Sequence, residues 1–375
     1  MWDDEKSGNY IPMAKKSREI PTVILSKFLT KSIHSIWREI INTPSPQFRI
    51  PCNPDNSIIN TDEKLSVLEI MGRKRLHYRM DRMSNRMDNL TFNGHNPKNS
   101  LTWEHILIEF VFEALGFSKN KIPFLKLAQN IDLNKIRRLN LNDLQFDAVL
   151  FGMAGMLDNL RFKDDYILKL KKYRDGLKDV LKFETMDISE WNYFRLRPQN
   201  FPSVRIAYAS AFCSELIKNN IFKNLILAFE KSKNPVKLIR DIFSDIKPSG
   251  YWNDHYNFGK SSLGRKFRIG KDRTDDIIIN VVFPFLLLYS KYFGNSIIAE
   301  KIYSEYSILT GYSKNEITKA MEKQLGIKIR KTISSQGAIH LHNFFCVKGR
   351  CNDCNIGNKI FVKEEPLYYL KIILY

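Results

Sequence analysis

Apolar side chains recur along most of this chain at intervals of three and four residues, the spacing of one face of an α-helix. In the segment that ends at Leu115, the helical pattern stops directly before Gly116, a usual helix terminator. The spacing predicts helices over 22–41, 62–90, 101–115, 121–129, 142–157, 164–181, 204–217, 222–229, 235–243, 275–292, 296–309, 314–325 and 333–345.

No alternation of polar and apolar residues is long enough to predict a sheet. We therefore expect an all-α fold, an irregular bundle of about a dozen helices with a Cys-rich C-terminal end. We divide it into 1–60, a connector with one helix; 61–190, a basic helical subdomain; and 191–375, a second helical subdomain. The most apolar run, 277–289, is too short to span a bilayer and contains Asn280 and Pro284, so we expect a kinked core helix.

The middle of the chain carries an arginine–proline segment, 191–207. Asn200 can cap a helix, and Pro202 suits the first helical turn. Three arginines gather near this predicted helix start, where free N–H groups favour an anion. We predict an anion site made by Arg195, Arg197, Arg205 and Asn200. The alternative is internal ion pairing of these arginines with Asp187 or Glu190.

The chain has 59 Lys and Arg against 40 Asp and Glu, a formal charge of +19. This excess favours a polyanionic partner such as nucleic acid, or an acidic partner domain, although a Lys-, Asn- and Ile-rich composition can also reflect coding bias. One candidate nucleic-acid face lies on the helix 62–90 and a second follows an aromatic loop. The candidates are Arg75, Arg79, Arg82, Arg86, Lys260, Arg265, Lys266 and Arg268. The alternative for the helix is a solvated charged face.

The aromatic loop 250–260 holds four aromatic side chains together with Asp254 and His255. Aromatic rings beside basic residues can stack on nucleobases. His255 next to a carboxylate is a candidate proton-transfer group. The alternative is a loop packed over the core with a hydrogen-bonded histidine.

Five cysteines are too few for a disulfide scaffold, and the N-terminus lacks a signal-peptide pattern, so we expect a cytoplasmic protein. Cys346, Cys351 and Cys354 have a spacing that suits zinc or an iron–sulfur cluster. The fourth ligand would be Cys52, His340 or His342. The alternative is three free thiols.

Several segments, in order, carry a resemblance to a known family. They are Ile50-Pro51-Cys52, 151–155, Phe194 to Ile206, Tyr251-Trp252 with 255–259, Ile279-Asn280 before Pro284, and the closing cysteines with Ile356-Gly357. The chain is similar to an uncharacterised bacterial family, domain of unknown function 2851. The family usually has Glu and Gln where this chain has Asp147 and Met153.

The resemblance implies a further N-terminal region with nuclease-like acidic and histidine motifs. We expect this chain to be the helical C-terminal part, without complete catalytic machinery, and to associate with nucleic acid. One alternative is a structural or interaction protein with a metal staple. Another is an enzyme that acts on a small anionic substrate through Arg195, Arg197, Arg205 and His255.

Overall fold

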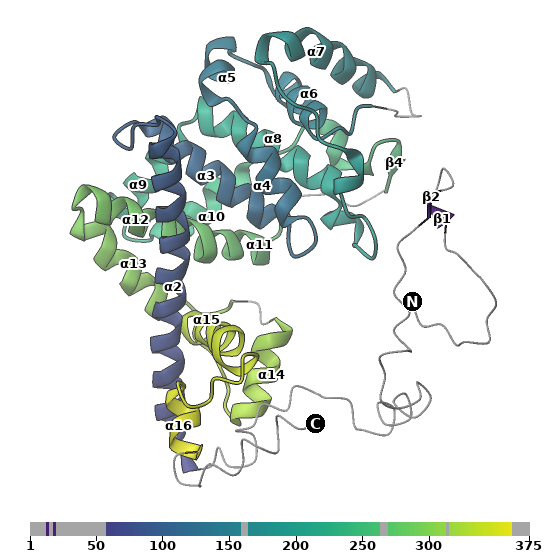
Figure 1. Ribbon diagram of the computed structural model, residues 1–375. Helices are drawn as coiled ribbons and strands as arrows, with labels where there is room; N and C mark the ends of the chain where they lie inside the picture. The colour runs from purple at the N-terminus through teal and green to yellow at the C-terminus, as the bar shows by residue number, and fades with distance from the viewer. Residues whose placement is uncertain are drawn as a thin grey trace, which may run out of the picture.

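The longest helix, α2 (Thr61–Phe92), runs the length of the molecule, and the other helices form an upper and a lower group beside it (Figure 1). The computed structural model describes residues 13–14, 18–19, 58–158, 164–262, 269–312 and 315–361. Asn60 caps α2, because its side chain accepts a hydrogen bond from the backbone N–H of Glu63 at 2.8 Å.

The upper group contains most of the helices. They are α3 (Ser100–Leu115), α4 (Lys121–Gln129), α5 (Leu133–Leu139), α6 (Asp143–Met153), α7 (Asp165–Leu181), α8 (Pro202–Lys218), α9 (Ile221–Lys231), α10 (Pro235–Asp245), α11 (Lys271–Ile277), α12 (Phe283–Phe293) and α13 (Ser296–Ile308). The lower group is α14 (Glu316–Leu325), α15 (Thr332–Leu341) and α16 (Asn355–Phe361). The predicted all-α class is confirmed.

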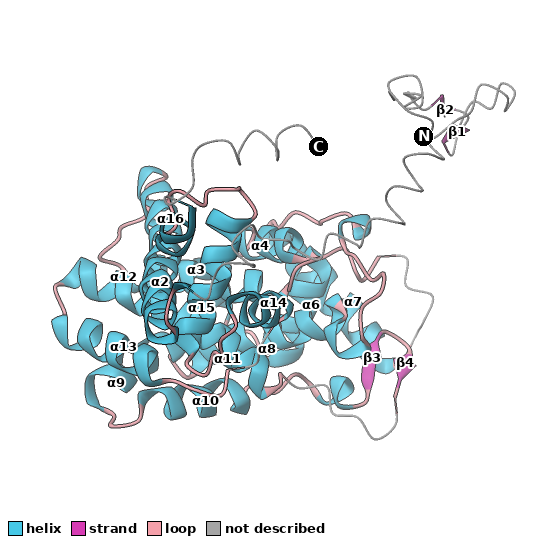
Figure 2. Cartoon of the chain, turned by 90° about the horizontal axis from the view of Figure 1, so that it is seen from below, coloured by secondary structure: helices cyan, strands magenta, loops and turns pink. Residues whose placement is uncertain are grey.

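Short elements connect these helices. There are 3₁₀ turns η3 (Ile188–Glu190), η4 (Pro198–Asn200) and η5 (Gly250–Asn253), and π-helical turns η6 (Ile278–Val282) and η7 (His342–Cys346). Strands β1 (Met13–Ala14) and β2 (Arg18–Glu19) pair antiparallel, as do β3 (His255–Asn257) and β4 (Lys260–Ser261). The β3–β4 hairpin lies at the edge of the molecule, beyond α7 and α8 (Figure 2).

Two glycines let α15 cross α2 at very close range. A Cβ atom on Gly337 would lie 1.7 Å from the Leu68 carbonyl oxygen, and one on Gly72 would lie 2.2 Å from the Ile333 carbonyl oxygen. Real Cβ atoms do not approach oxygen so closely, so neither position accepts a side chain without separating the helices. This crossing attaches the lower group to the upper one.

The described apolar interior forms two clusters. The larger extends from Leu76 to Ile333 and draws side chains from both sides of residue 190. The smaller joins the first half of α2 to α14, α15 and α16, and it includes Ile59, Cys354 and Ile356. The two clusters meet along α2, so the middle of that helix lies at the junction of the two groups.

The predicted helices agree with the structure in most places, and the differences have local causes. Helix α6 ends at Met153, not at residue 157, because Gly155 adopts a positive φ of 68°. Helices α5 and α16 were not predicted because each spans only seven residues, too few to show a helical period. The predicted helix 22–41 lies outside the described residues.

The apolar run that we predicted as a core helix belongs to one continuous helical stretch, Lys271–Phe293. By length and composition this stretch could cross a membrane, but 67% of its apolar window is buried inside the protein, as in a core helix. The expected irregularity takes the form of the π-helical turn η6 around Asn280. Such turns contain one extra residue and occur often at functional sites.

Candidate functional site: a buried arginine cluster

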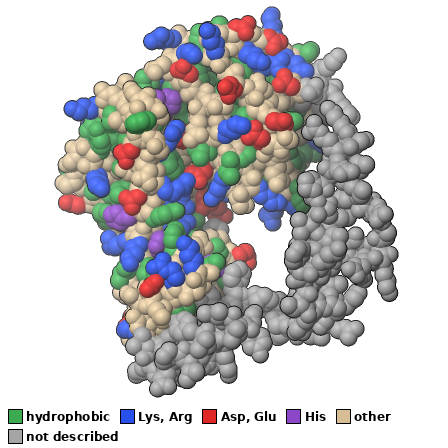
Figure 3. Space-filling model, viewed as in Figure 1, with side chains coloured by type: hydrophobic (Ala, Val, Ile, Leu, Met, Phe, Trp, Pro, Cys, Tyr) green, Lys and Arg blue, Asp and Glu red, His purple; other side chains and the backbone are tan. Residues whose placement is uncertain are grey.

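Arginines from three helices that are distant in the sequence are connected through two aromatic residues, Phe117 and Tyr312. We call this set the arginine junction: Arg75, Arg79 and Arg82 of α2, Arg205 of α8, and Arg273 of α11. Lys and Arg side chains are concentrated along the middle and lower part of α2 in the view of Figure 3. The structure therefore brings two predicted sites, the basic face of α2 and the arginine–proline segment, toward one place.

The ring of Phe117 lies between the two arginines that come from the upper group. The guanidinium carbon of Arg273 is 3.4 Å from the ring centroid, and that of Arg205 is 4.9 Å from it. Phe117 has a φ of 52°, a strained value for a non-glycine residue. Strain of this kind persists only where the surroundings fix the backbone, and it is concentrated at functional sites.

Tyr312 connects the arginines of α2 to Arg273. Its hydroxyl donates a hydrogen bond to Asp276 at 2.5 Å and lies beside the side-chain amides of Asn280 and Gln336. Asp276 also pairs with Arg273 at 3.1 Å. On the α2 side, Arg75 donates to the Gln336 amide oxygen at 2.7 Å.

Several polar atoms in this region are buried without a hydrogen-bond partner. They are Nε of Arg79, Nε of Arg205, Nε of Arg273, Oδ1 of Asn280 and Nε2 of Gln336. A buried polar atom without a partner costs about 1–3 kcal/mol. Five such atoms, contributed by α2, α8, α11, η6 and α15, indicate a ligand or ordered water at this place.

Among the described residues, the positive charge of the junction exceeds the negative charge beside it. Five guanidiniums face two described carboxylates, Glu113 and Asp276. Burial and the nearby Arg273 lower the pKa of Arg205 to about 9, and burial together with Arg75 lowers the pKa of Arg79 to about 10. Uncompensated buried cations of this kind are stabilised by a bound anion.

Two of the four predicted α2 arginines are neutralised by α3. Arg86 forms a fork with Glu109, with two N–O distances of 2.7 Å, and Arg82 holds both oxygens of Glu113 at 3.1 Å. The helix face is thus half-buried against α3 and differs from the freely solvated surface that we considered. Nucleic-acid contact through these residues stays a prediction.

The four residues of the predicted anion site do not lie together: Arg205 bonds to Asn200 in the interior, whereas the other two arginines lie at the surface. Arg205 is buried and donates to Oδ1 of Asn200 at 2.9 Å, so Asn200 does not cap α8; Phe201 occupies the cap position. Pro202 begins the helix, as predicted. Arg195 and Arg197 are exposed.

The internal ion pairs that we considered for these arginines do not form. Glu190 pairs with Lys126 at 2.7 Å, and Asp187 accepts from the backbone N–H of Ser189. Arg195 instead lies 4.9 Å above the ring of Phe194, which is 68% exposed. Its charge is therefore available at the surface.

The loop of exposed arginines adjoins the loop that carries Phe117. Lys119 donates to the Phe194 carbonyl oxygen at 2.6 Å, and Asn120 exchanges two hydrogen bonds with the backbone of Asn192. We call the exposed side chains of these two loops the basic rim: Lys119, Phe194, Arg195 and Arg197. The rim connects through residues 117–120 to the buried Arg205 and Arg273.

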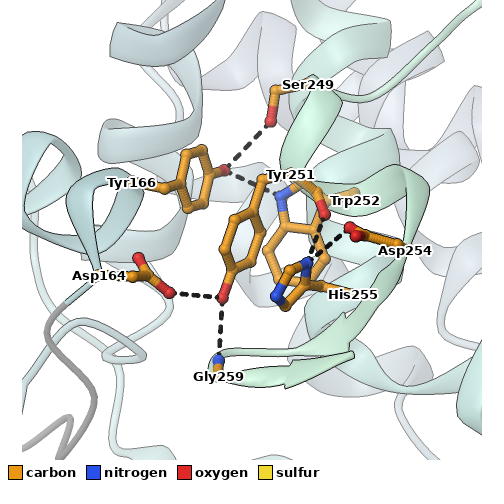
Figure 4. Close-up of polar contacts among 8 residues, drawn as sticks. All are labelled: Asp164, Tyr166, Ser249, Tyr251, Trp252, Asp254, His255 and Gly259. Atoms are coloured by element: carbon orange, nitrogen blue, oxygen red, sulfur yellow. Dashed lines mark hydrogen bonds and ion pairs between the residues drawn. The ribbon is translucent and has the colours of Figure 1, made fainter. Parts of the chain in front are cut away.

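A second polar region, which we call the aromatic network, surrounds the predicted histidine. It comprises Asp164, Tyr166, Tyr251, Trp252 and His255 (Figure 4), together with Asp147, which bonds to Tyr166. The hydroxyl of Tyr166 donates to Asp147 at 2.8 Å and accepts from the Trp252 indole at 2.8 Å. That of Tyr251 donates to Asp164 and accepts from the backbone N–H of Gly259. Tyr251 stacks between Tyr166 and His255, with centroid distances of 4.2 and 3.9 Å.

The protonation of His255 follows from its two partners. Nδ1 lies 2.7 Å from Asp254 and 3.0 Å from the Tyr251 carbonyl oxygen. Both partners accept hydrogen bonds, so Nδ1 carries the proton and Nε2 keeps the lone pair when the ring is neutral. Nε2 makes no hydrogen bond to a described residue, and its catalytic role stays a prediction.

His255 makes its contacts within its own loop, with Asp254 and with the carbonyl oxygen and ring of Tyr251, and none with Arg195, Arg197 or Arg205. The next residue in β3, Tyr256, packs on Phe201 with a centroid distance of 5.6 Å, and its carbonyl oxygen accepts from Ser203. The convergence required by the small-substrate enzyme hypothesis is therefore not observed.

The three cysteines of the predicted metal site lie in the lower group. Cys351 and Cys354 are buried, and Cys346 packs against the smaller apolar cluster. Among the described residues, no three His, Cys, Asp or Glu side chains are arranged to hold a metal ion. Cys52 lies outside the described residues, but Ile59, seven positions later, is buried in the cluster that contains Cys354. The zinc or iron–sulfur site, with Cys52, His340 or His342 as fourth ligand, stays a prediction.

Of the second basic run, Lys260 is exposed on β4, whereas Arg265, Lys266 and Arg268 lie outside the described residues. Sequence reasoning did not assign roles to Phe117, Arg273, Tyr312 and Gln336. They are far apart in the sequence, and no spacing relates them. The available signals were Phe117 directly after a helix-ending glycine and Arg273 in a basic run.

The fold and this site define a basic, all-helical protein with an arginine cluster buried between two groups of helices. The chain belongs to the family described as Protein of unknown function (DUF2851), whose profile matches residues 7–315. Searches of curated proteins and of solved structures gave no match.

Proposed function

We propose that this chain binds nucleic acid, with the arginine junction holding a phosphate group and the basic rim holding the adjoining strand. The observation that carries the proposal is the set of buried guanidiniums with unpaired Nε atoms, among them Arg79, Arg205 and Arg273. Arginine binds phosphate oxygens through paired N–H groups, and the bond is strengthened where water is excluded.

The excess positive charge of the site favours a nucleic acid over a small anion. The junction has more guanidiniums than carboxylates, and the whole chain carries a formal charge of +19. A single small carboxylate would neutralise little of this excess. A nucleic acid supplies both a phosphate for the buried site and further phosphates for Arg195, Arg197 and Lys119 on the surface.

The basic rim has the side chains that single-stranded nucleic acid requires. Phe194 is exposed and lies under the guanidinium of Arg195, while the Lys119 ammonium is 5.8 Å from its ring centroid. An exposed ring among cations can stack on a nucleobase while the cations contact the backbone. Because stacking is tolerant of sequence, we expect weak base preference.

The test is fluorescence anisotropy with a labelled 20-nucleotide single strand at several salt concentrations. We expect wild-type binding that weakens steeply with salt. Arg205→Met and Arg273→Met should each weaken binding about tenfold and reduce the salt slope by roughly one charge. Arg138→Met is the matched control, because Arg138 is exposed on α5, at the opposite end of the upper group.

Two outcomes would contradict the proposal. One is no wild-type binding at about 50 mM salt, where electrostatic binding is strong. The other is equal binding by Arg205→Met, Arg273→Met and Arg138→Met, because charge alone would then account for the interaction.

A further inference from the structure

We infer that the arginine junction recognises a terminal phosphate of a nucleic acid strand, a phosphomonoester at its 5′ or 3′ end. The inference rests on the proposed function and specifies which phosphate enters the buried site. Its basis is the depth of the site and the kind of polar atoms that are unpaired at its inner end.

The residues of the junction differ widely in exposure, and we call the buried, unpaired side-chain atoms of Arg79, Asn280 and Gln336 its inner end. The Arg82 side chain is 37% exposed and that of Arg273 is 16% exposed. Arg205 is 5% exposed, and Gln336, whose amide faces Arg75, is 1% exposed. An internal phosphodiester has a sugar on each side, so both sugars would have to enter with it. A terminal phosphate is attached through one bond and can reach the inner groups alone.

The unpaired atoms at the inner end match a phosphomonoester better than a phosphodiester. Nε of Arg79 and Nε2 of Gln336 are donors, whereas Oδ1 of Asn280 is an acceptor. A phosphomonoester has three terminal oxygens and a second pKa of about 6, so it can accept several hydrogen bonds and donate one. A phosphodiester has two such oxygens and no proton to donate to Asn280.

The backbone supports a site at this place. Asn280 lies in the π-helical turn η6, its amide nitrogen donates to the Asp276 carbonyl oxygen at 3.0 Å, and its Oδ1 is buried without a hydrogen-bond partner. Tyr312 lies beside both Asn280 and Gln336. The amides of Asn280 and Gln336 and the hydroxyl of Tyr312 thus lie close to one another and to Arg75 and Arg79.

The experiment compares three single strands of one 20-nucleotide sequence: with a 5′-phosphate, with a 3′-phosphate, and with hydroxyl groups at both ends. The wild-type chain should bind one phosphorylated strand at least tenfold more tightly than the strand with two hydroxyl ends. The end that gives the increase identifies the source of the phosphate.

Arg79→Met should bring the ratio of the affinities for the phosphorylated and the hydroxyl-ended strand close to one, whatever its effect on binding as a whole. Arg138→Met should keep the preference. Circular dichroism and thermal melting show whether each variant is folded.

A competition experiment with the wild-type chain needs no variant. Phenyl phosphate, a monoester, should displace the phosphorylated strand at lower concentration than dimethyl phosphate, a diester. Equal affinity for all three strands, or equal competition by the two esters, would overturn the inference and leave the proposed function standing. No binding to any strand at low salt would overturn both.

Discussion

The arginine junction and the aromatic network are both polar regions within a helical protein, but they satisfy their polar groups differently. In the aromatic network the hydroxyls of Tyr166 and Tyr251 each donate one hydrogen bond; that of Tyr251 accepts one and that of Tyr166 accepts two, from Trp252 and Ser249. In the arginine junction, Arg79, Arg205 and Arg273 each leave a buried Nε without a partner.

This difference indicates that the aromatic network stabilises the fold and that the arginine junction binds a ligand. Groups that satisfy one another, such as Asp147 and Tyr166, stabilise the fold and require nothing from outside. Groups that remain unpaired reduce stability until a ligand arrives. The sequence marks both regions with unusual residues, and only the structure shows which of them lacks partners.

The largest expected effect comes from the helix crossing that assembles the junction. Gly337→Ala should destabilise the protein by about 3 kcal/mol or more, because the new methyl group meets the Leu68 carbonyl oxygen and displaces α15 with Gln336. Gly176→Ala is the control. Gly176 is exposed in α7 with no atom near its Cβ position, so alanine should stabilise the helix by roughly 0.5–1 kcal/mol. Urea unfolding measures both, and equal effects would refute the close-crossing account.

The next effect distinguishes a satisfied network from an unsatisfied one. Tyr166→Phe removes the hydroxyl that serves both Asp147 and Trp252. The loss of these two hydrogen bonds should cost about 2–3 kcal/mol in unfolding experiments, without a change in oligonucleotide affinity for the folded fraction. A loss of affinity in fully folded Tyr166→Phe protein would place the aromatic network in the binding site.

A pH dependence of stability should follow from Asp147. Burial raises the pKa of its carboxyl group to about 6 in the folded protein, above its ordinary value. The folded state then holds more protons than the unfolded state between pH 4 and 6, so this group makes stability fall as pH rises through that range, by on the order of 2 kcal/mol. In Asp147→Asn that contribution should be absent. Stability curves of wild type and Asp147→Asn that run parallel from pH 4 to 7 would contradict this assignment.

The smallest effect has the opposite sign to most core substitutions. Arg205→Met removes a buried cation whose Nε has no partner and whose neighbour is another cation, Arg273. Without a bound anion, its stability should be unchanged or higher by about 1 kcal/mol. Thermal unfolding in low-salt buffer measures this. A loss of several kcal/mol would mean that Arg205 is held by internal partners and that the junction resembles the aromatic network.

Much of the fold could be predicted because helices depend on local spacing. The 3–4 periodicity located α2, α3 and α4 within two residues, and Pro202 marked the start of α8. The site was predicted only in parts. Arg79 and Arg205 were singled out for different roles, since 126 positions separate them and no pattern links them. Their association depends on how the helices pack, which local periodicity does not determine.

Asn200 is a second case in which the local sequence pattern did not predict the contact that a side chain makes, here with a residue only five positions away. Its position two residues before Pro202 favours a helix cap, yet its side chain accepts from Arg205. A buried guanidinium gains more from this bond than a solvent-facing helix end would. The competition between the two roles is decided by the burial of Arg205.

The most direct test of the central claim, that the arginine junction binds an anion, is a phosphate titration followed by thermal unfolding at constant ionic strength. Wild-type protein should gain several degrees in melting temperature as phosphate binds the folded state. The double variant Arg205→Met/Arg273→Met should gain little. An equal shift in both proteins, or no shift in the wild type, would contradict the account.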